Sequence, residues 1–163
     1  MSTTPSPAPE TAQDVTFEIG NFAGNPVIES LREQKPQIFA QVQAYYEAAV
    51  EPATPGEISL GERAFIAQHV AAGIPSPVLA SWYRQRLATL GEEIDESTPR
   101  MQAILARIAL VNTNPDVSTP EDIQALRDAG LSPAAIIALS QLIAFVHYQA
   151  RLLAGLSALG AQS

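Results

Sequence analysis

The chain of 163 residues contains no cysteine. This absence excludes disulfides, thiolate catalysis and cysteine metal sites together. Histidine occurs only twice, and two imidazoles with the carboxylates of this chain do not make a convincing metal site. We therefore expect neither a metal nor another cofactor.

Basic residues are also scarce. Nine lysines and arginines stand against 17 aspartates and glutamates, and the formal net charge is −8. A chain of this charge offers no basic patch that could collect phosphates. Nucleic acid is therefore not an expected partner.

Two further features are missing, a secretory signal and a long apolar run. The chain does not begin with a basic segment followed by an apolar one. Its most apolar stretch, residues 131–146, is shorter than the ~20 residues that a membrane-spanning helix needs. We interpret this stretch as a buried core helix and expect a cytoplasmic protein without a membrane partner.

The composition indicates one folded domain preceded by a tail. Hydrophobic residues make up 47 % and charged residues only 16 % of the chain, which excludes disorder for most of it. Residues 1–14 are rich in Ser, Thr, Pro and Ala, and we predict a disordered N-terminal tail there. Residues 15–163 are predicted to form a single helical domain, on which Phe17, Ile19 and Phe22 dock as an extended segment.

Helix start signals recur along the whole domain. A capping residue followed by proline, which is favoured at the first helical position, is found at five places. Ser59 and Glu62 have the spacing of a capping box. No run shows the alternation typical of a strand, so the sequence predicts an all-α fold, an antiparallel bundle of about six to seven helices. The five capped starts are Asn25-Pro26, Ser76-Pro77, Thr98-Pro99, Thr119-Pro120 and Ser132-Pro133.

Two segments carry a family resemblance. The first is Glu62-Arg63-Ala64-Phe65-Ile66-Ala67, and the second runs from Thr119 to Leu156 and contains Arg151 and Gly155-Leu156 at matching positions. In this order and spacing they resemble the alkylhydroperoxidase D-like/carboxymuconolactone decarboxylase-like family, in its peroxidase-related branch. The resemblance covers roughly residues 58–159 and implies an alkylhydroperoxidase-like helical domain that assembles into trimers or hexamers.

The redox motif of that family is lost. Family enzymes use a glutamate, a Cys-x-x-Cys pair and a histidine, and the ungapped alignment places these on Ala64, Ser76, Leu79 and Tyr83. A serine is a poor nucleophile without a base and cannot form a disulfide. We expect Ser76 to cap the helix that begins at Pro77, and the aromatic side chains of Trp82 and Tyr83 to fill the former redox pocket.

Four polar residues remain as candidates for a site. Glu62 is either a displaced general base or the capping-box partner of Ser59. His69 either faces the former redox pocket or is a core histidine. His147 and Arg151 are one helical turn apart and share a face. They are interpreted either as a carboxylate-binding pair or as a buried structural pair.

Two functional hypotheses follow. The preferred one is a protein without thiol peroxidase activity that acts as an oligomeric binding or assembly partner, either with itself or with a cysteine-bearing family relative. Uncovered apolar faces of Ile136, Leu139, Ile143 and Leu153 are expected to drive that assembly. The alternative is a cofactor-free enzyme of the decarboxylase type acting on a small organic acid, with His69, His147 and Arg151 as candidate acid, base and carboxylate anchor. Whether the chain is an enzyme stays open, and the missing cysteines speak against the peroxidase activity that the family name implies.

Overall fold

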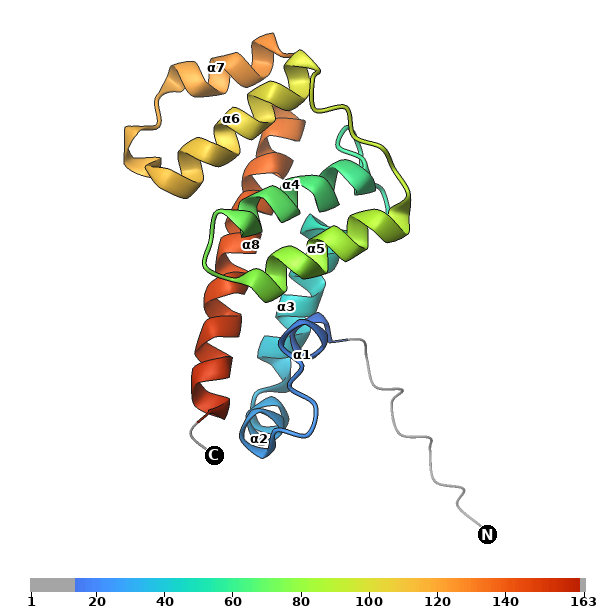
Figure 1. Ribbon diagram of the computed structural model, residues 1–163, viewed down its shortest axis with the longest axis vertical. Helices are drawn as coiled ribbons and strands as arrows, with labels where there is room; N and C mark the ends of the chain where they lie inside the picture. Colours follow the sequence, from blue (N-terminus) through green and yellow to red (C-terminus); the bar gives the residue numbers. More distant parts are fainter. Residues whose placement is uncertain (1–13, 162–163) are drawn as a thin grey trace.

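The chain folds into helices joined by short loops (Figure 1). The computed structural model describes residues 14–161, which contain eight α-helices, one 3₁₀ helix and no strand, so the all-α prediction is confirmed. Residues 1–13, most of the predicted tail, lie outside the described part. The helices are α1 Val15–Gly20, α2 Pro26–Gln34, α3 Pro36–Ala49, α4 Leu60–Ala72, α5 Pro77–Leu90, α6 Pro99–Thr113, η1 Pro115–Val117, α7 Pro120–Asp128 and α8 Pro133–Gly160.

Helix α1 corrects the prediction of an extended docking segment. The Asp14 carboxylate, assigned from sequence to the tail, accepts hydrogen bonds from the amides of Thr16 and Phe17 and so caps a helical turn. Asn21 then leaves the helix in the left-handed region, at φ 49°. The apolar side chains still dock on the body, but from a helix, which brings the number of α-helices to eight instead of six or seven.

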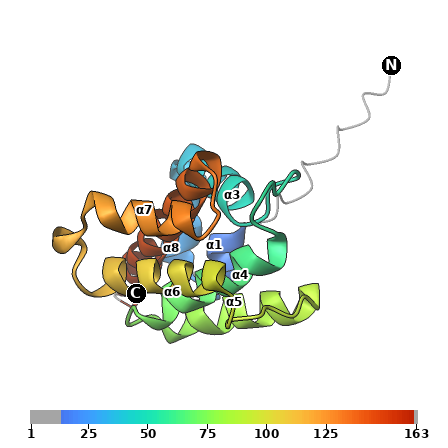
Figure 2. The same cartoon turned by 90° about the horizontal axis from the view of Figure 1, so that it is seen from above.

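The longest helix, α8, runs through both halves of the molecule. In Figure 1 the helices α1, α2 and α3 lie beside its C-terminal half, and α6 and α7 lie near its start. Helices α4 and α5 are direct neighbours, and the view from above in Figure 2 places α4 between α5 and α8. The three-helix stack α5–α4–α8 therefore forms the centre of the protein.

The packing of α8 corrects the expectation that its apolar face needs another subunit. Ile136, Leu139, Ile143 and Leu153 are all buried within the single chain. Helices α1, α2, α3, α4 and α7 all contact α8 and together cover this face. Among the helices in residues 14–161, α8 is the one long and apolar enough to cross a membrane by length and composition, and half of its most apolar part is buried, as in a core helix.

A buried arginine fixes the loop between α3 and α4. Arg63 is 5 % exposed, and its guanidinium donates to three backbone carbonyls. The N···O distances are 2.7 Å to Ala49, 2.9 Å to Pro55 and 3.1 Å to Ile58. Because one guanidinium carries five N–H donors in a planar fork, a single side chain can hold the whole loop. The buried charge is solvated by these carbonyl dipoles rather than by a carboxylate.

We expect Arg63→Met to destabilise the fold. Methionine keeps the apolar stem but leaves three carbonyls without their donor, so the free energy of unfolding should fall by about 2–5 kcal/mol in urea denaturation. The matched control is Arg84→Met on α5, where the arginine is exposed. That change should stay within about 0.5 kcal/mol. Equal effects of the two substitutions would contradict the role of Arg63.

Candidate functional site

The structure brings three of the sequence-predicted residues to one pocket. Ser76, His147 and Arg151 all line a cavity of about 470 Å³ between the start of α5 and the middle of α8. Apart from these three and Ser157, the lining is apolar, with side chains from both helices and from the loop before α5. These apolar residues are Ile74, Pro75, Pro77, Val78, Ala150, Leu153 and Ala154.

The first turn of α5 opens onto this pocket without a side-chain cap. Ser76 occupies the N-cap position, as predicted, but its hydroxyl makes no capping hydrogen bond, which corrects its expected role. Pro77 has no amide hydrogen, and the amides of Val78 and Leu79 have no acceptor inside the helix. The start of α5 therefore keeps free N–H donors together with the partial positive charge of a helix N-terminus.

His147 is held in one tautomer. Its Nε2 lies 2.9 Å from Oδ1 of Asn112, and Nδ2 of Asn112 donates to the Val70 carbonyl at 3.2 Å. Oδ1 is therefore the acceptor, and Nε2 of His147 carries the hydrogen. Gly73 permits this arrangement, since a Cβ there would lie 2.1 Å from the Asn112 amide nitrogen. Burial, and then the charge of Arg151, lower the pKa of His147. The imidazole is thus neutral at pH 7, with Nδ1 as an acceptor.

Arg151 is exposed, which corrects the hypothesis of a buried structural pair with His147. One of its terminal nitrogens donates to the His147 carbonyl of its own helix at 3.2 Å. No carboxylate within residues 14–161 pairs with it. The helical spacing correctly predicts that both residues lie on one face of α8. It does not predict how far neighbouring helices cover that face. The remaining N–H donors of the guanidinium are available at the pocket.

The two other candidate residues do not join this pocket. Nδ1 of His69 lies 3.0 Å from the Phe65 carbonyl one turn earlier, and its ring packs on the Phe65 ring at 4.1 Å. Glu62 forms the predicted capping box with Ser59 and an ion pair with Arg100. His69, His147 and Arg151 therefore do not form the three-residue set that the enzyme alternative requires.

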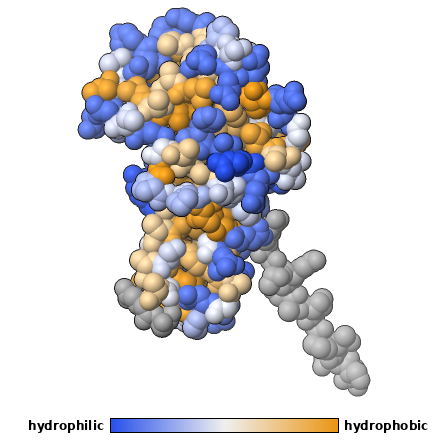
Figure 3. Space-filling model, viewed as in Figure 1, coloured by the Kyte–Doolittle hydropathy of each residue, from blue (hydrophilic) through white to orange (hydrophobic). Residues whose placement is uncertain are grey.

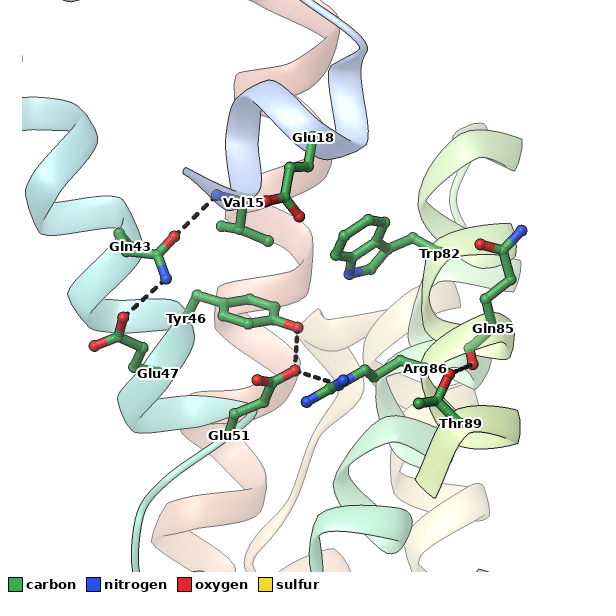
Figure 4. A pocket seen from close by; sticks show the side chains of 10 residues that line it. All are labelled: Val15, Glu18, Gln43, Tyr46, Glu47, Glu51, Trp82, Gln85, Arg86 and Thr89. Carbon is green, nitrogen blue, oxygen red and sulfur yellow. Dashed lines mark hydrogen bonds and ion pairs between the residues drawn. The ribbon is translucent and has the colours of Figure 1, made fainter. Parts of the chain in front are cut away.

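The other positions that the sequence alignment places on the family's redox motif are packed shut. Ala64, Leu79 and Tyr83 are buried, at 1 % exposure or less. The Tyr83 hydroxyl donates to Oε1 of Gln149 on α8 at 2.5 Å, and burial raises the pKa of this hydroxyl. Tyr83 thus fills the space, as predicted. Trp82 does not, because it points instead toward a second pocket between α1, α3 and α5 (Figure 4).

Comparisons with known proteins leave the family open. No protein-family model, no curated protein and no solved structure matches this chain. The resemblance to the alkylhydroperoxidase-like family therefore stays a prediction from its motifs.

The Tyr83–Gln149 hydrogen bond yields a test of whether these positions are structural. Tyr83→Phe leaves the buried Gln149 side chain without its donor and should lower the free energy of unfolding by about 1–3 kcal/mol. Nε2 of Gln149 already lacks a partner within the described part of the chain. The double change Tyr83→Phe/Gln149→Met removes all these polar groups and should recover the loss. Chemical denaturation of the four proteins measures the cycle, and a double variant less stable than either single one would contradict a purely structural role.

Proposed function

We propose that this protein is a non-redox binding protein that takes a small organic carboxylate between α5 and α8. The observation that carries the proposal is that the free donors of Arg151 and the uncapped first turn of α5 line one cavity. A guanidinium binds a carboxylate through two parallel hydrogen bonds, and a helix N-terminus favours an anion. Both features therefore select the same chemical group.

The rest of the cavity supports a ligand with a hydrocarbon part. A volume of about 470 Å³ is within the range of small-molecule sites, which are mostly apolar with few polar groups. The lining from Ala150, Leu153 and Val78 offers such a surface. Neutral His147 adds a hydrogen-bond acceptor without repelling Arg151. A medium-chain or aromatic monocarboxylate fits this pattern.

The residues that line the pocket favour binding over catalysis. Without cysteine the chain cannot attack a peroxide through a thiolate or close a disulfide. The acid–base alternative calls for His69 beside His147, and His69 bonds to its own helix instead. On the resemblance of its motifs, we propose a relative of the alkylhydroperoxidase-like family that keeps the helical scaffold without the redox chemistry.

Carboxylate binding is measured by calorimetry with hexanoate, and with hexanamide as its neutral counterpart. We expect hexanoate to bind and hexanamide to bind at least about tenfold more weakly, since it lacks the charge that Arg151 pairs with. Arg151→Gln should raise the Kd for hexanoate about tenfold, whereas Arg84→Gln, which removes an exposed charge elsewhere on the body, should not change it. A set of monocarboxylates in which none binds would refute the proposal.

The assembly part of the function finds support in a different face of α8. A row of seven residues follows one side of this helix at intervals of three or four positions. Six are exposed and Leu152 is half-buried. None is charged, so two copies of this acidic chain can meet there without repulsion. Figure 3 shows apolar residues over the half of the molecule that contains the end of α8. The row consists of Ile137, Gln141, Ala144, Tyr148, Leu152, Gly155 and Leu159.

We propose that a second copy of the chain covers this row, within the trimer or hexamer that the resemblance implies. Light scattering at micromolar concentration should give a mass above the 17.3 kDa of one chain. Ile137→Glu places a charge in the row and should shift the protein toward the monomer. Val117→Glu is the matched control, because Val117 is similarly exposed but lies in η1, away from α8. A wild-type protein that scatters as a monomer would rule out this assembly.

A further inference from the structure

The row of seven uncharged residues on α8 is symmetric about its central member, Tyr148. Counted from Tyr148, the other members stand four, seven and eleven positions away on each side. In a two-fold contact between two copies, residue i meets residue j and residue j meets residue i. When the two rows run antiparallel, a centre at Tyr148 is the one that gives every member of the row a partner from the row.

The side chains that face each other in this arrangement differ in size where they need to. Ala144 faces Leu152, and Gln141 faces Gly155, so a small residue meets a larger one in both pairs. Facing positions that combine large and small side chains interdigitate without voids. Tyr148 meets its own copy at the centre, and aromatic pairs of this kind add to the stability of a contact.

Gly155 has no role within its own chain that requires glycine. A Cβ built there would meet no atom within 4 Å, and its backbone is not in the left-handed region. A glycine inside a helix weakens that helix relative to alanine. The missing side chain therefore leaves room for a group from outside the chain, and the two-fold contact brings Gln141 of the second copy to that room.

The two ends of the row also fit each other. Ile137 is 60 % exposed, the largest fraction among the exposed large apolar side chains of residues 14–161. Leu159 borders a groove of about 530 Å³ between α2 and the end of α8, whose lining carries no charge. In the two-fold contact, Ile137 of one copy lies opposite Leu159 of the other and therefore beside this groove. The lining consists of Pro26, Val27, Ser30, Leu31, Gln34 and Leu159.

The charges of the helix agree with an antiparallel contact. The row extends from the second turn of α8 to its last turn, so both ends of the helix take part. Antiparallel packing places the partial positive charge at the start of one α8 beside the partial negative charge at the end of the other. A parallel contact would instead bring like ends together.

We infer that this row is a two-fold contact, in which α8 of a second copy packs antiparallel with Tyr148 at the symmetry axis. The inference rests on the assembly part of the proposed function and adds the orientation of the second copy and the residues that face each other. Three such pairs make a hexamer, whereas a lone trimer has no two-fold axis.

Disulfide trapping tests the facing residues, because the chain has no cysteine of its own. Under mild oxidation, Tyr148→Cys should form a covalent dimer by itself. Ala144→Cys and Leu152→Cys should each stay uncoupled alone and form a dimer when mixed. Two copies of position 144 would be about 12 Å apart along the helices, whereas a disulfide needs Cα atoms within about 7 Å. Val117→Cys, exposed on η1, is the control and should give no dimer on a non-reducing gel.

A packing variant tests the room beside Gly155. Gly155→Leu fills the space assigned to Gln141 and should raise the dissociation constant of the contact at least about tenfold in light scattering. Leucine favours a helix and meets no atom of its own chain at that Cβ, so circular dichroism should show an unchanged helix content. Ala125→Leu, at an exposed position of α7, is the matched control and should leave the dissociation constant unchanged.

Several outcomes would overturn the two-fold contact while leaving the proposed assembly intact. Ala144→Cys and Leu152→Cys that each form a dimer alone would indicate a parallel contact. A stable mass of three chains, or Gly155→Leu that associates like the wild type, would equally contradict it. A wild-type protein that is a monomer at every concentration would instead refute the proposed assembly itself, and the inference with it.

Discussion

The rest of the structure depends on the hydrogen bonds that Arg63 donates to three backbone carbonyls. It closes the loop between α3 and α4 and thereby fixes where α4 begins. Helix α4 lies between α5 and α8 and is the main neighbour of α5. Both pockets have a wall from α5, so the position of each wall follows from α4 and, through it, from Arg63. A lysine could not replace this arginine, because its single ammonium cannot reach three divergent carbonyls with fixed geometry.

The two pockets lie toward opposite ends of the same helix, α5, and the partial charges at these two ends differ in sign. The pocket proposed to bind a carboxylate is built on the first turn of α5, where unpaired N–H groups give a partial positive charge. The pocket between α1, α3 and α5 is lined by Gln85, Arg86 and Thr89 in the last two turns, near the end with partial negative charge. One helix of 14 residues, about 21 Å long at 1.5 Å per residue, therefore borders two pockets at ends of opposite partial charge. Arg86 lies in the second of these pockets and pairs there with Glu51.

Much of the fold could be predicted from the sequence, because its helix starts depend on local chemistry. A capping residue followed by proline marked α2, α5, α6, α7 and α8 within a residue of their observed starts. The loop closure by Arg63 and the Tyr46–Glu51–Arg86 contacts could not be predicted in this way. They join residues on different elements, and nothing within one helical turn indicates which distant carbonyl or carboxylate will be near. Helix α1 is a different case, since its local signal, Asp14 before an apolar turn, is present in the sequence, but the composition of residues 1–14 predicts a tail instead.

The candidate site, like the fold, could be predicted from the sequence only where it depends on residues of one helix. Helical spacing places His147 and Arg151 on one face, and the structure adds Ser76 from a helix about 70 residues earlier. Exposure was not predictable, because a periodic pattern shows which residues share a face but not which neighbours cover that face. This is why Arg151 is at the surface while Ile136 and Ile143 are buried.

The four positions that align with the redox motif of the resembled family differ in how far the fold leaves them open. Leu79 and Tyr83 are fully buried between helices, and Tyr83 is tied to Gln149 of α8. A reactive group at either position would need solvent or substrate access, which the packing does not leave. Ser76 differs because it lies before the helix rather than inside it, and it alone of the four positions lines a cavity. The centre of α5 is thus closed by packing, and the open polar groups lie at its two ends, which is why we place the proposed binding at one of these ends.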